Sequence, residues 1–350
     1  MYSPLFHLIH LPKSAGNSIW RDLIASTEKY SLNPNHVIKL DTRNFVDDKY
    51  WKNLYFQKSQ EYNNNTSFIP QNSLSILAHK EVNKILQKFK FNHRILIHHH
   101  NSGAFRLPLE KQIKKNYDNC QTSSHKWDLK KNPEIYVFTL RNSLERSISQ
   151  IKFAFMVNSI FETPTTPRSK NYKNGPYWIG GLDADAIPFD RRPAIEMLAL
   201  DYEHDIENRS EYIEYAIQII PEFATYQLRY ILTFIISKNP TETNEILWMK
   251  SNEEILKLWN ISKDSIRNMS KINKIGAIFL DKYKKFYFST SFEKFISENL
   301  EINKFEINQV FKETKTNFQE DSIVVNDDFD FYSKIENKFL KDVFGFSENF

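Results

Sequence analysis

The first hydrophobic pattern along the chain predicts a buried strand that leads through a tight turn into an amphipathic helix. Residues 5–11 are almost continuously apolar, which is typical of a buried strand. The polar residues 12–18 follow and predict the turn. Beyond them, apolar residues recur on one helix face: Ile19, Trp20, Leu23 and Ile24. Strand, loop and helix in this order form the opening unit of a nucleotide-binding α/β fold.

A second strand–loop–helix unit is predicted from residue 134 onward. Residues 134–140 form an apolar run. The apolar residues after it are spaced by 4, 3 and 4, as in an amphipathic helix: Leu144, Ile148, Ile151 and Phe155. Shorter apolar runs predict further strands at residues 94–98 and 285–290.

Three further segments differ in their patterns. Residues 30–80 are polar and poorly periodic. Residues 192–265 have a mostly helical pattern with breaks at Pro221 and Pro240. An amphipathic helix is expected near the C-terminus, with its apolar face at Ile335, Phe339 and Val343.

Residues 158–193 differ in composition from the rest, because they hold five of the 13 prolines and three of the 7 glycines. Irregular segments of this length are often lids or binding loops. Tyr172, Tyr177 and Trp178 lead us to expect that this excursion covers an acceptor site, with a plain surface loop as the alternative. Taken as a whole, the pattern predicts a single α/β domain over residues 1–350, with a P-loop-like central parallel sheet flanked by helices.

Composition narrows the function only a little. The net charge of +4 is too small and too dispersed to indicate a nucleic-acid partner. The single cysteine, Cys120, allows no intrachain disulfide and no thiolate-rich metal site. The sequence has no apolar stretch of about 18 residues, so we predict no membrane span.

The turn at residues 12–18 is the first candidate phosphate site. A helix N-terminus offers unpaired backbone N–H groups to an anion, and Gly16 lets the backbone approach closely. Lys13 adds a full charge, and Ser14 and Ser18 add hydroxyl groups. The segment lacks the Walker A pattern, which argues against an ordinary ATPase or GTPase. A plain strand-to-helix turn with a solvated lysine is the alternative.

Arg141 and Ser149 form the second candidate phosphate site. Arg141 follows the strand at residues 134–140 directly, and Ser149 lies two turns into the next helix. A guanidinium fork together with a hydroxyl group suits a phosphate monoester. In the alternative, Arg141 caps a sheet edge and Ser149 faces solvent.

Three consecutive histidines, His98, His99 and His100, supply a candidate general base. Because successive strand residues alternate faces, His98 and His100 are expected to point one way and His99 the other. Histidine suits proton transfer near neutral pH. A metal site is the alternative, but no carboxylate or cysteine motif joins these histidines, so we expect no metal.

Together these motifs resemble those of the sulfotransferase superfamily, in particular its heparan sulfate 2-O-sulfotransferase-like branch. The first motif resembles Pro-Lys-Ser/Thr-Ala/Gly-Gly-x-Ser/Thr, with Asn17 at a position where Thr or Ser is commoner. The second resembles Arg-x-Pro-x-x-Arg-x-x-Ser, matched by Arg141, Arg146 and Ser149, with Ser143 in place of proline. The histidines resemble the His-x-His run of that branch.

The resemblance implies a sulfotransferase fold and a sulfo donor, 3′-phosphoadenosine 5′-phosphosulfate (PAPS). It assigns the 5′-phosphosulfate to the first motif: Lys13, Ser14, Ala15, Gly16, Asn17 and Ser18. It assigns the 3′-phosphate to Arg141 and Ser149, and catalysis to Lys13 and to His98 or His100. The acceptor it implies is a hydroxyl group of a sugar or glycolipid. Since relatives with an N-terminal anchor have residues before the first strand that this chain lacks, we expect a cytoplasmic, bacterial enzyme.

Two other functions remain open at this stage. A P-loop kinase-like phosphotransferase with a degenerate loop would need an aspartate for magnesium, for which Asp183 and Asp185 are available. A carbohydrate-binding or scaffold module would tolerate loss of Lys13 and the histidines. Nothing in the sequence predicts an oligomeric state.

Overall fold

A computed structural model describes twelve stretches of the chain: residues 5–32, 37–41, 94–99, 134–160, 191–237, 242–243, 245–271, 274–280, 285–300, 302, 305 and 323–345. The strands are β1 (Leu5–Ile9), β2 (Val37–Asp41), β3 (Arg94–His99), β4 (Glu134–Arg141), β5 (Ile275–Leu280) and β6 (Phe286–Phe288). The α-helices are α1 (Gly16–Tyr30), α5 (Ser143–Ile160), α7 (Arg192–His204), α8 (Arg209–Ile219), α9 (Tyr226–Ile235), α11 (Asn252–Lys271), α12 (Thr290–Asn299) and α13 (Asp327–Phe344). A 3₁₀ helix, η4 (Pro221–Thr225), and a π-helix, η5 (Glu245–Met249), flank α9.

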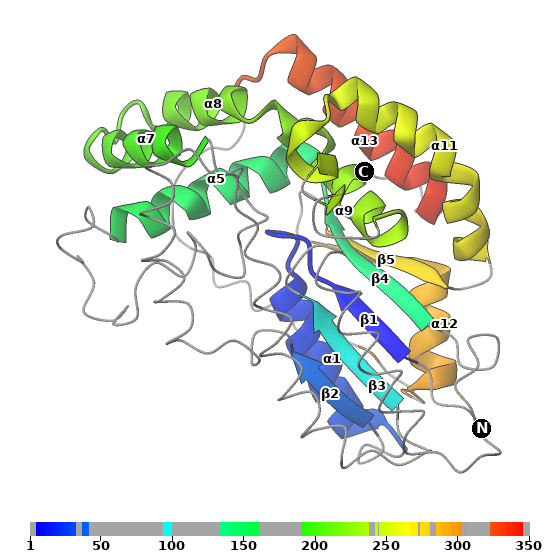
Figure 1. The fold of residues 1–350 in the computed structure, drawn as a ribbon. Helices are drawn as coiled ribbons and strands as arrows, with labels where there is room; N and C mark the ends of the chain where they lie inside the picture. The colour runs from blue at the N-terminus through cyan, green and yellow to red at the C-terminus, as the bar shows by residue number, and fades with distance from the viewer. Residues whose placement is uncertain are drawn as a thin grey trace.

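The described strands form one sheet in the order β2-β3-β1-β4-β5-β6 (Figure 1). The first five run parallel, and β6 pairs antiparallel with β5. The predicted α/β class and mostly parallel sheet are thus confirmed, but the sheet is mixed rather than wholly parallel. The strand expected at residues 285–290 is also shorter, because Thr290 already starts α12.

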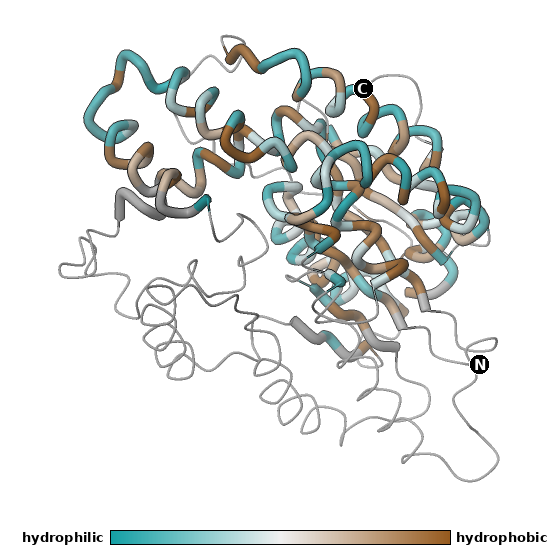
Figure 2. The backbone as a smooth tube through the Cα atoms, turned by 45° about the horizontal axis from the view of Figure 1, so that its top comes forward, coloured by the Kyte–Doolittle hydropathy of each residue, from teal (hydrophilic) through white to brown (hydrophobic). Residues whose placement is uncertain are grey.

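Helices cover both faces of the sheet because β1 and β4 alternate apolar side chains between them. On one face, Phe6 and Leu8 of β1 pack with α1 and α12. On the other, Ile9 of β1 and Phe138 of β4 pack with α5, α9, α11 and α13. Figure 2 shows hydrophobic and hydrophilic positions alternating along the covering helices. A strand buried on both faces reads as a continuous apolar run, as residues 5–11 do.

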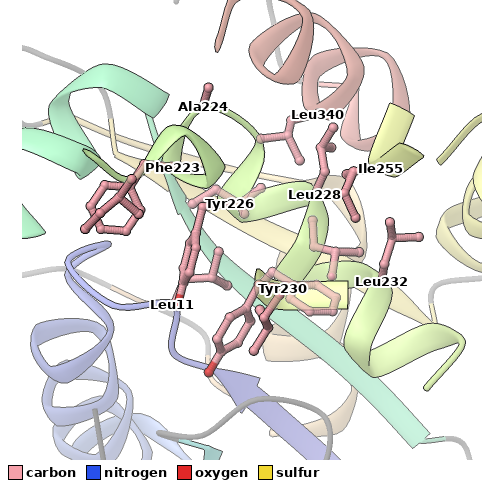
Figure 3. Packing of buried hydrophobic residues seen from close by; sticks show 14 of the residues in the cluster. Leu11, Phe223, Ala224, Tyr226, Leu228, Tyr230, Leu232, Ile255 and Leu340 are labelled. Atoms are coloured by element: carbon pink, nitrogen blue, oxygen red, sulfur yellow. The ribbon is translucent and has the colours of Figure 1, made fainter. Parts of the chain in front are cut away.

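The layer of helices beside β1 and β4 has a dense core of aromatic side chains. Tyr226 and Tyr230 of α9 are fully buried, with ring centroids 5.8 Å apart, and Phe223 of η4 lies 5.9 Å from Tyr226. Leu11, just past the end of β1, belongs to the same cluster (Figure 3). This packing anchors the chain where it leaves β1.

Several expectations fall outside the described residues. They are most of the excursion at 158–193, the break at Pro240 and the histidine at position 100. Within the described helices, none is both long and apolar enough to cross a bilayer.

Candidate functional site

The carboxyl ends of β1 and β4 lie side by side at the centre of the sheet. The two strands are parallel neighbours, with Ile9 opposite Phe138. From β1 the next described strand is β2, on one side, whereas β5, the next strand after β4, lies on the other side (Figure 1). Ligands of open α/β sheets bind at such a switch point, outside the carboxyl ends of the strands. Both candidate phosphate motifs leave the sheet at this point.

Thr139 of β4 holds the end of β1 through two hydrogen bonds. Its hydroxyl oxygen accepts a hydrogen bond from the amide of Leu11 at 3.2 Å and donates to the carbonyl of Ile9 at 3.4 Å. One buried side chain of β4 therefore holds the residues with which β1 ends and the loop begins.

The loop after β1 has an unusual backbone. Lys13 and Ala15 have φ angles of 65° and 62°, in the left-handed region that residues with a Cβ seldom adopt. Each such residue costs about 1–2 kcal/mol relative to a right-handed conformation. Left-handed residues alternating with others turn successive N–H groups toward a common concavity, which is an anion-binding arrangement. The phosphate loop predicted for this segment would need such an arrangement.

No side chain caps the first turn of α1 among the described residues. Ala15 is the N-cap and has no side chain that could cap the helix, while its carbonyl accepts from the amides of Ser18 at 3.0 Å and Ile19 at 3.1 Å. The first amides of a helix have no intrahelical acceptor, and they lie at the positive end of its dipole. The buried hydroxyl of Ser14 has no hydrogen-bond partner among the described residues either.

Gly16 is required by the close approach of His10. A Cβ atom at position 16 would lie 2.3 Å from both Cγ and Cδ2 of the imidazole. Glycine therefore serves here to admit the ring of His10, as well as to start the helix. The ring of His10 in turn lies directly against the first turn of α1.

His98 lies in a stack of rings beneath the loop. Its ring centroid is 5.4 Å from that of His10, with the planes 6° apart, and 4.9 Å from Trp20 of α1. His98 is fully buried, whereas His10 is partly exposed. His10 is thus the imidazole of this pair that reaches the surface, and our sequence interpretation did not include it. The signal was its position on the same strand face as Phe6 and Leu8.

His99 faces the opposite side of the sheet, as strand alternation predicted. Its Nε2 lies 2.9 Å from Nδ1 of His7, and its ring meets the edge of Phe234 on α9. The structure therefore assigns His99 to packing against the helices, away from α1.

Lys13 reaches across from the first motif to the second. Its Nζ lies 3.3 Å from the ring centroid of Phe153, on the helix that follows Arg141. A cation over an aromatic face is held by the ring quadrupole. The ammonium group is therefore placed between the phosphate loop and α5.

The side chain of Arg141 pairs with Glu145, four residues further along the chain. The Nε of Arg141 pairs with Oε2 of Glu145 at 3.4 Å, and the two side chains are 15% and 16% exposed. Ser149 is partly buried within α5, and no hydrogen bond joins it to Arg141 in the part of the chain that the structure describes.

Arg146, the third matched position of the second motif, lies inside the protein. Its guanidinium carbon is 4.3 Å from the ring centroid of Tyr226 and 4.9 Å from that of Phe223. Burial lowers the pKa of Arg146 to about 10, although Tyr226 and Glu336 act in the opposite direction. This arginine fixes α5 against η4 and α9.

Comparison with known proteins adds no assignment. No protein-family model, no curated protein and no solved structure matches the chain. Across the described stretches, no group of three or more His, Cys, Asp or Glu residues is arranged to hold a metal ion.

Proposed function

We propose that this chain is a sulfotransferase that uses PAPS and has the sulfotransferase fold. One observation carries the proposal. The two candidate phosphate motifs, which are far apart in the sequence, follow neighbouring parallel strands at the switch point of the sheet. A donor with a phosphate at each end needs two such sites. The left-handed loop, the uncapped first turn of α1 and the buried Ser14 hydroxyl fit its 5′-phosphosulfate.

Sulfo transfer requires the protein to position donor and acceptor and to stabilise the charge that develops on the leaving phosphate. When bound, PAPS supplies the sulfo group: the acceptor oxygen bonds to sulfur, the bond from sulfur to the 5′-phosphate oxygen breaks, and its electron pair stays on that phosphate. Lys13 and the first amides of α1 stabilise the negative charge that grows there. Arg141 and Ser149 hold the 3′-phosphate, so that the donor lies across the ends of β1 and β4.

A histidine takes the proton of the acceptor hydroxyl. The resemblance to the sulfotransferase family assigns the role of general base to His98 or His100. Because His98 is buried beneath His10 and Trp20, we add the partly exposed His10 as a candidate. The acceptor remains a hydroxyl group of a sugar or glycolipid by resemblance alone.

Three alanine variants separate the candidates. The variant at the base should lose about 10²–10⁴ of turnover while the donor still binds. We measure kcat and the dissociation constant of 3′-phosphoadenosine 5′-phosphate for His10→Ala, His98→Ala and His100→Ala. His99→Ala is the matched control and should change stability more than kcat. Near wild-type kcat in all three test variants would remove the histidines from the mechanism.

The central test is preference for the 3′-phosphate. Calorimetry should show tighter binding of 3′-phosphoadenosine 5′-phosphate than of 5′-AMP, and Arg141→Ala should reduce that preference about ten- to a hundredfold. Arg267→Ala is the matched control, because this arginine lies on α11 and pairs there with Asp264. Equal affinity of the wild-type protein for the two nucleotides would overturn the proposal.

The kinase-like alternative is tested in the same assay. It needs a carboxylate that holds magnesium, and both sequence candidates, Asp183 and Asp185, lie outside the described residues. Magnesium-dependent binding of ATP, with no response to the 3′-phosphate, would favour that alternative.

A further inference from the structure

The backbone of Arg141 is held by a side chain from another part of the chain. Its amide donates to Oε1 of Gln227 at 2.9 Å, and its carbonyl accepts from Nε2 of the same residue at 2.7 Å. Gln227 is fully buried in the first turn of α9. A side-chain amide has the donor and the acceptor of a peptide group, so it can bind this strand end as a strand neighbour would.

Glu336 of α13 holds Gln227 in turn. Its Oε1 accepts from the backbone amides of Gln227 at 2.7 Å and Leu228 at 3.1 Å, and its Oε2 accepts from Nε2 of Gln227 at 3.0 Å. Thr225, the N-cap of α9, makes no capping hydrogen bond with its side chain. Glu336 therefore caps α9 from a distance of more than a hundred positions in the sequence, at the helix end where a negative charge is favoured.

The chemistry of the carboxylate sets the direction of this network. Every group that hydrogen-bonds Glu336, the hydroxyl of Ser143 included, donates to it, and an ionised carboxylate only accepts. Nε2 of Gln227 must therefore face Glu336, which leaves Oε1 to face the amide of Arg141. If the amide of Gln227 were turned over, it would meet both Glu336 and the backbone of Arg141 with the wrong atoms.

We propose that Gln227 and Glu336 are positioning residues of the phosphate site, which set the preference for a 3′-phosphate by holding the backbone from which the Arg141 side chain extends. This inference rests on the proposed function. A buried charged network is weak evidence for stability, because apolar residues of similar volume often stabilise a fold as well. The effect to measure is therefore specificity at the site, and stability is measured alongside it.

The test measures dissociation constants of 3′-phosphoadenosine 5′-phosphate and 5′-AMP on the full chain. Gln227→Leu removes both hydrogen bonds to the backbone of Arg141. The dissociation constant of 5′-AMP divided by that of 3′-phosphoadenosine 5′-phosphate should therefore fall about tenfold. Glu336→Gln places a donor against Nε2 of Gln227 and should reduce the ratio in the same direction. In both variants the affinity for 5′-AMP should stay unchanged, because the loop after β1 is untouched.

Asn326→Ala is the matched control, since it weakens the N-terminus of the same helix, α13, without touching the network. It should lower the unfolding temperature and leave the ratio at its wild-type value. An unchanged ratio in folded Gln227→Leu or Glu336→Gln, or a parallel loss of affinity for both nucleotides, would overturn the inference. Should Gln227→Leu fail to fold, Glu336→Gln decides.

Hydrogen exchange separates this inference from the proposed function. The amide of Arg141 should exchange faster in Gln227→Leu, while the amide of Phe138 in the same strand stays protected. If the wild-type protein does not prefer the 3′-phosphate, the proposed function fails, and faster exchange at Arg141 still supports the positioning role. Unchanged exchange at Arg141 contradicts that role whatever the nucleotide preference.

Discussion

Among single residues, Gly16 and Glu336 are under the clearest physical constraints. Gly16 is buried where the imidazole of His10 lies against α1, and no larger residue fits without a shift. Glu336 is a fully buried carboxylate whose hydrogen-bond partners are all donors. The first residue admits the ring of His10 against α1, and the second holds Gln227, which binds the end of β4.

Replacing Gly16 by alanine should disturb both stability and binding. The added Cβ would lie 2.3 Å from the ring of His10, so the ring or the loop must move. Forcing an extra methyl group into a packed site costs about 1–3 kcal/mol. Urea unfolding should show this loss, and calorimetry should show weaker binding of 3′-phosphoadenosine 5′-phosphate.

Gly345→Ala serves as the control for Gly16→Ala. Gly345 caps α13 with a φ of 67° and has open space around it, so alanine there should cost about 1–2 kcal/mol through the backbone alone. Its nucleotide affinity should equal that of the wild-type protein. Wild-type affinity in Gly16→Ala as well would mean that the contact with His10 does not shape the site.

Glu336 should make stability depend on pH in a defined direction. Burial raises its pKa, against the opposing effects of hydrogen bonds from Ser143 and Gln227 and of the charge on Arg146. Arg229, also buried, is a second positive group whose charge interacts with it. A raised pKa means that the carboxyl group of Glu336 stays protonated to a higher pH in the native state than in the unfolded state. The contribution of Glu336 to stability should therefore fall as pH rises above its unfolded pKa of about 4.3.

Urea unfolding of the wild-type protein and Glu336→Gln across this pH range measures the effect. The difference in the free energy of unfolding, wild type minus variant, should decrease with rising pH. A difference that increases with pH would mean that the donors around Glu336 outweigh its burial and lower its pKa.

Among the elements, α13 joins the C-terminal part of the chain to the centre of the sheet. It starts at an asparagine cap, in which Oδ1 of Asn326 accepts from the amide of Phe329 at 2.8 Å. It ends at Gly345, whose amide donates to the carbonyl of Lys341 at 2.9 Å. Between these caps, Leu340 and Phe344 pack into the same core as Tyr226 and Tyr230 of α9. Glu336 is thus presented by a helix that is fixed at both ends.

Removing the asparagine cap should weaken α13 by a predictable amount. Asn326→Ala leaves the amide of Phe329 without its side-chain acceptor, and losing such a cap costs about 1 kcal/mol. Urea unfolding should show this loss, with the slope of the transition unchanged. Asn326→Asp is the matched control, because it keeps the acceptor and should retain wild-type stability. Equal stability of all three proteins would mean that the cap contributes nothing.

On the scale of the whole molecule, two cores meet at a shared sheet. One lies between the sheet and the pair α1 and α12, and the other between the sheet and the remaining helices (Figures 1 and 2). The candidate site lies where both cores reach the carboxyl ends of β1 and β4. A ligand that binds the loop after β1 and Arg141 together would therefore join two parts of the structure that pack separately.

Binding at this site should stabilise the whole fold. With 3′-phosphoadenosine 5′-phosphate at a hundred times its dissociation constant, the free energy of unfolding should rise by about 2.7 kcal/mol. Differential scanning calorimetry should show a single transition at a higher temperature, with a smaller rise for 5′-AMP at the same concentration. Lys13→Ala should reduce the rise for both nucleotides. No rise with either nucleotide would mean that the site does not bind them.

The sequence by itself determined the elements with a clear local period. Three predicted strands correspond to β1, β3 and β4: residues 5–11, 94–98 and 134–140. They could be predicted because a strand buried on both faces has a continuous run of apolar residues. The motifs beginning at Lys13 and Arg141 were located for the same reason, since each directly follows such a strand. Burial of His98 and His99 on opposite faces followed from strand alternation.

Only the tertiary structure decided which of these segments meet. β2 lies in a polar stretch and gave no periodic signal, while β5 is fully apolar but was not predicted. The rings of His10 and His98 stack because the strand order makes β1 and β3 neighbours. Glu336 accepts hydrogen bonds from Gln227 because α13 packs against α9. A local period reports which face of an element is buried. Which other element covers that face depends on long-range contacts, and no local pattern encodes those.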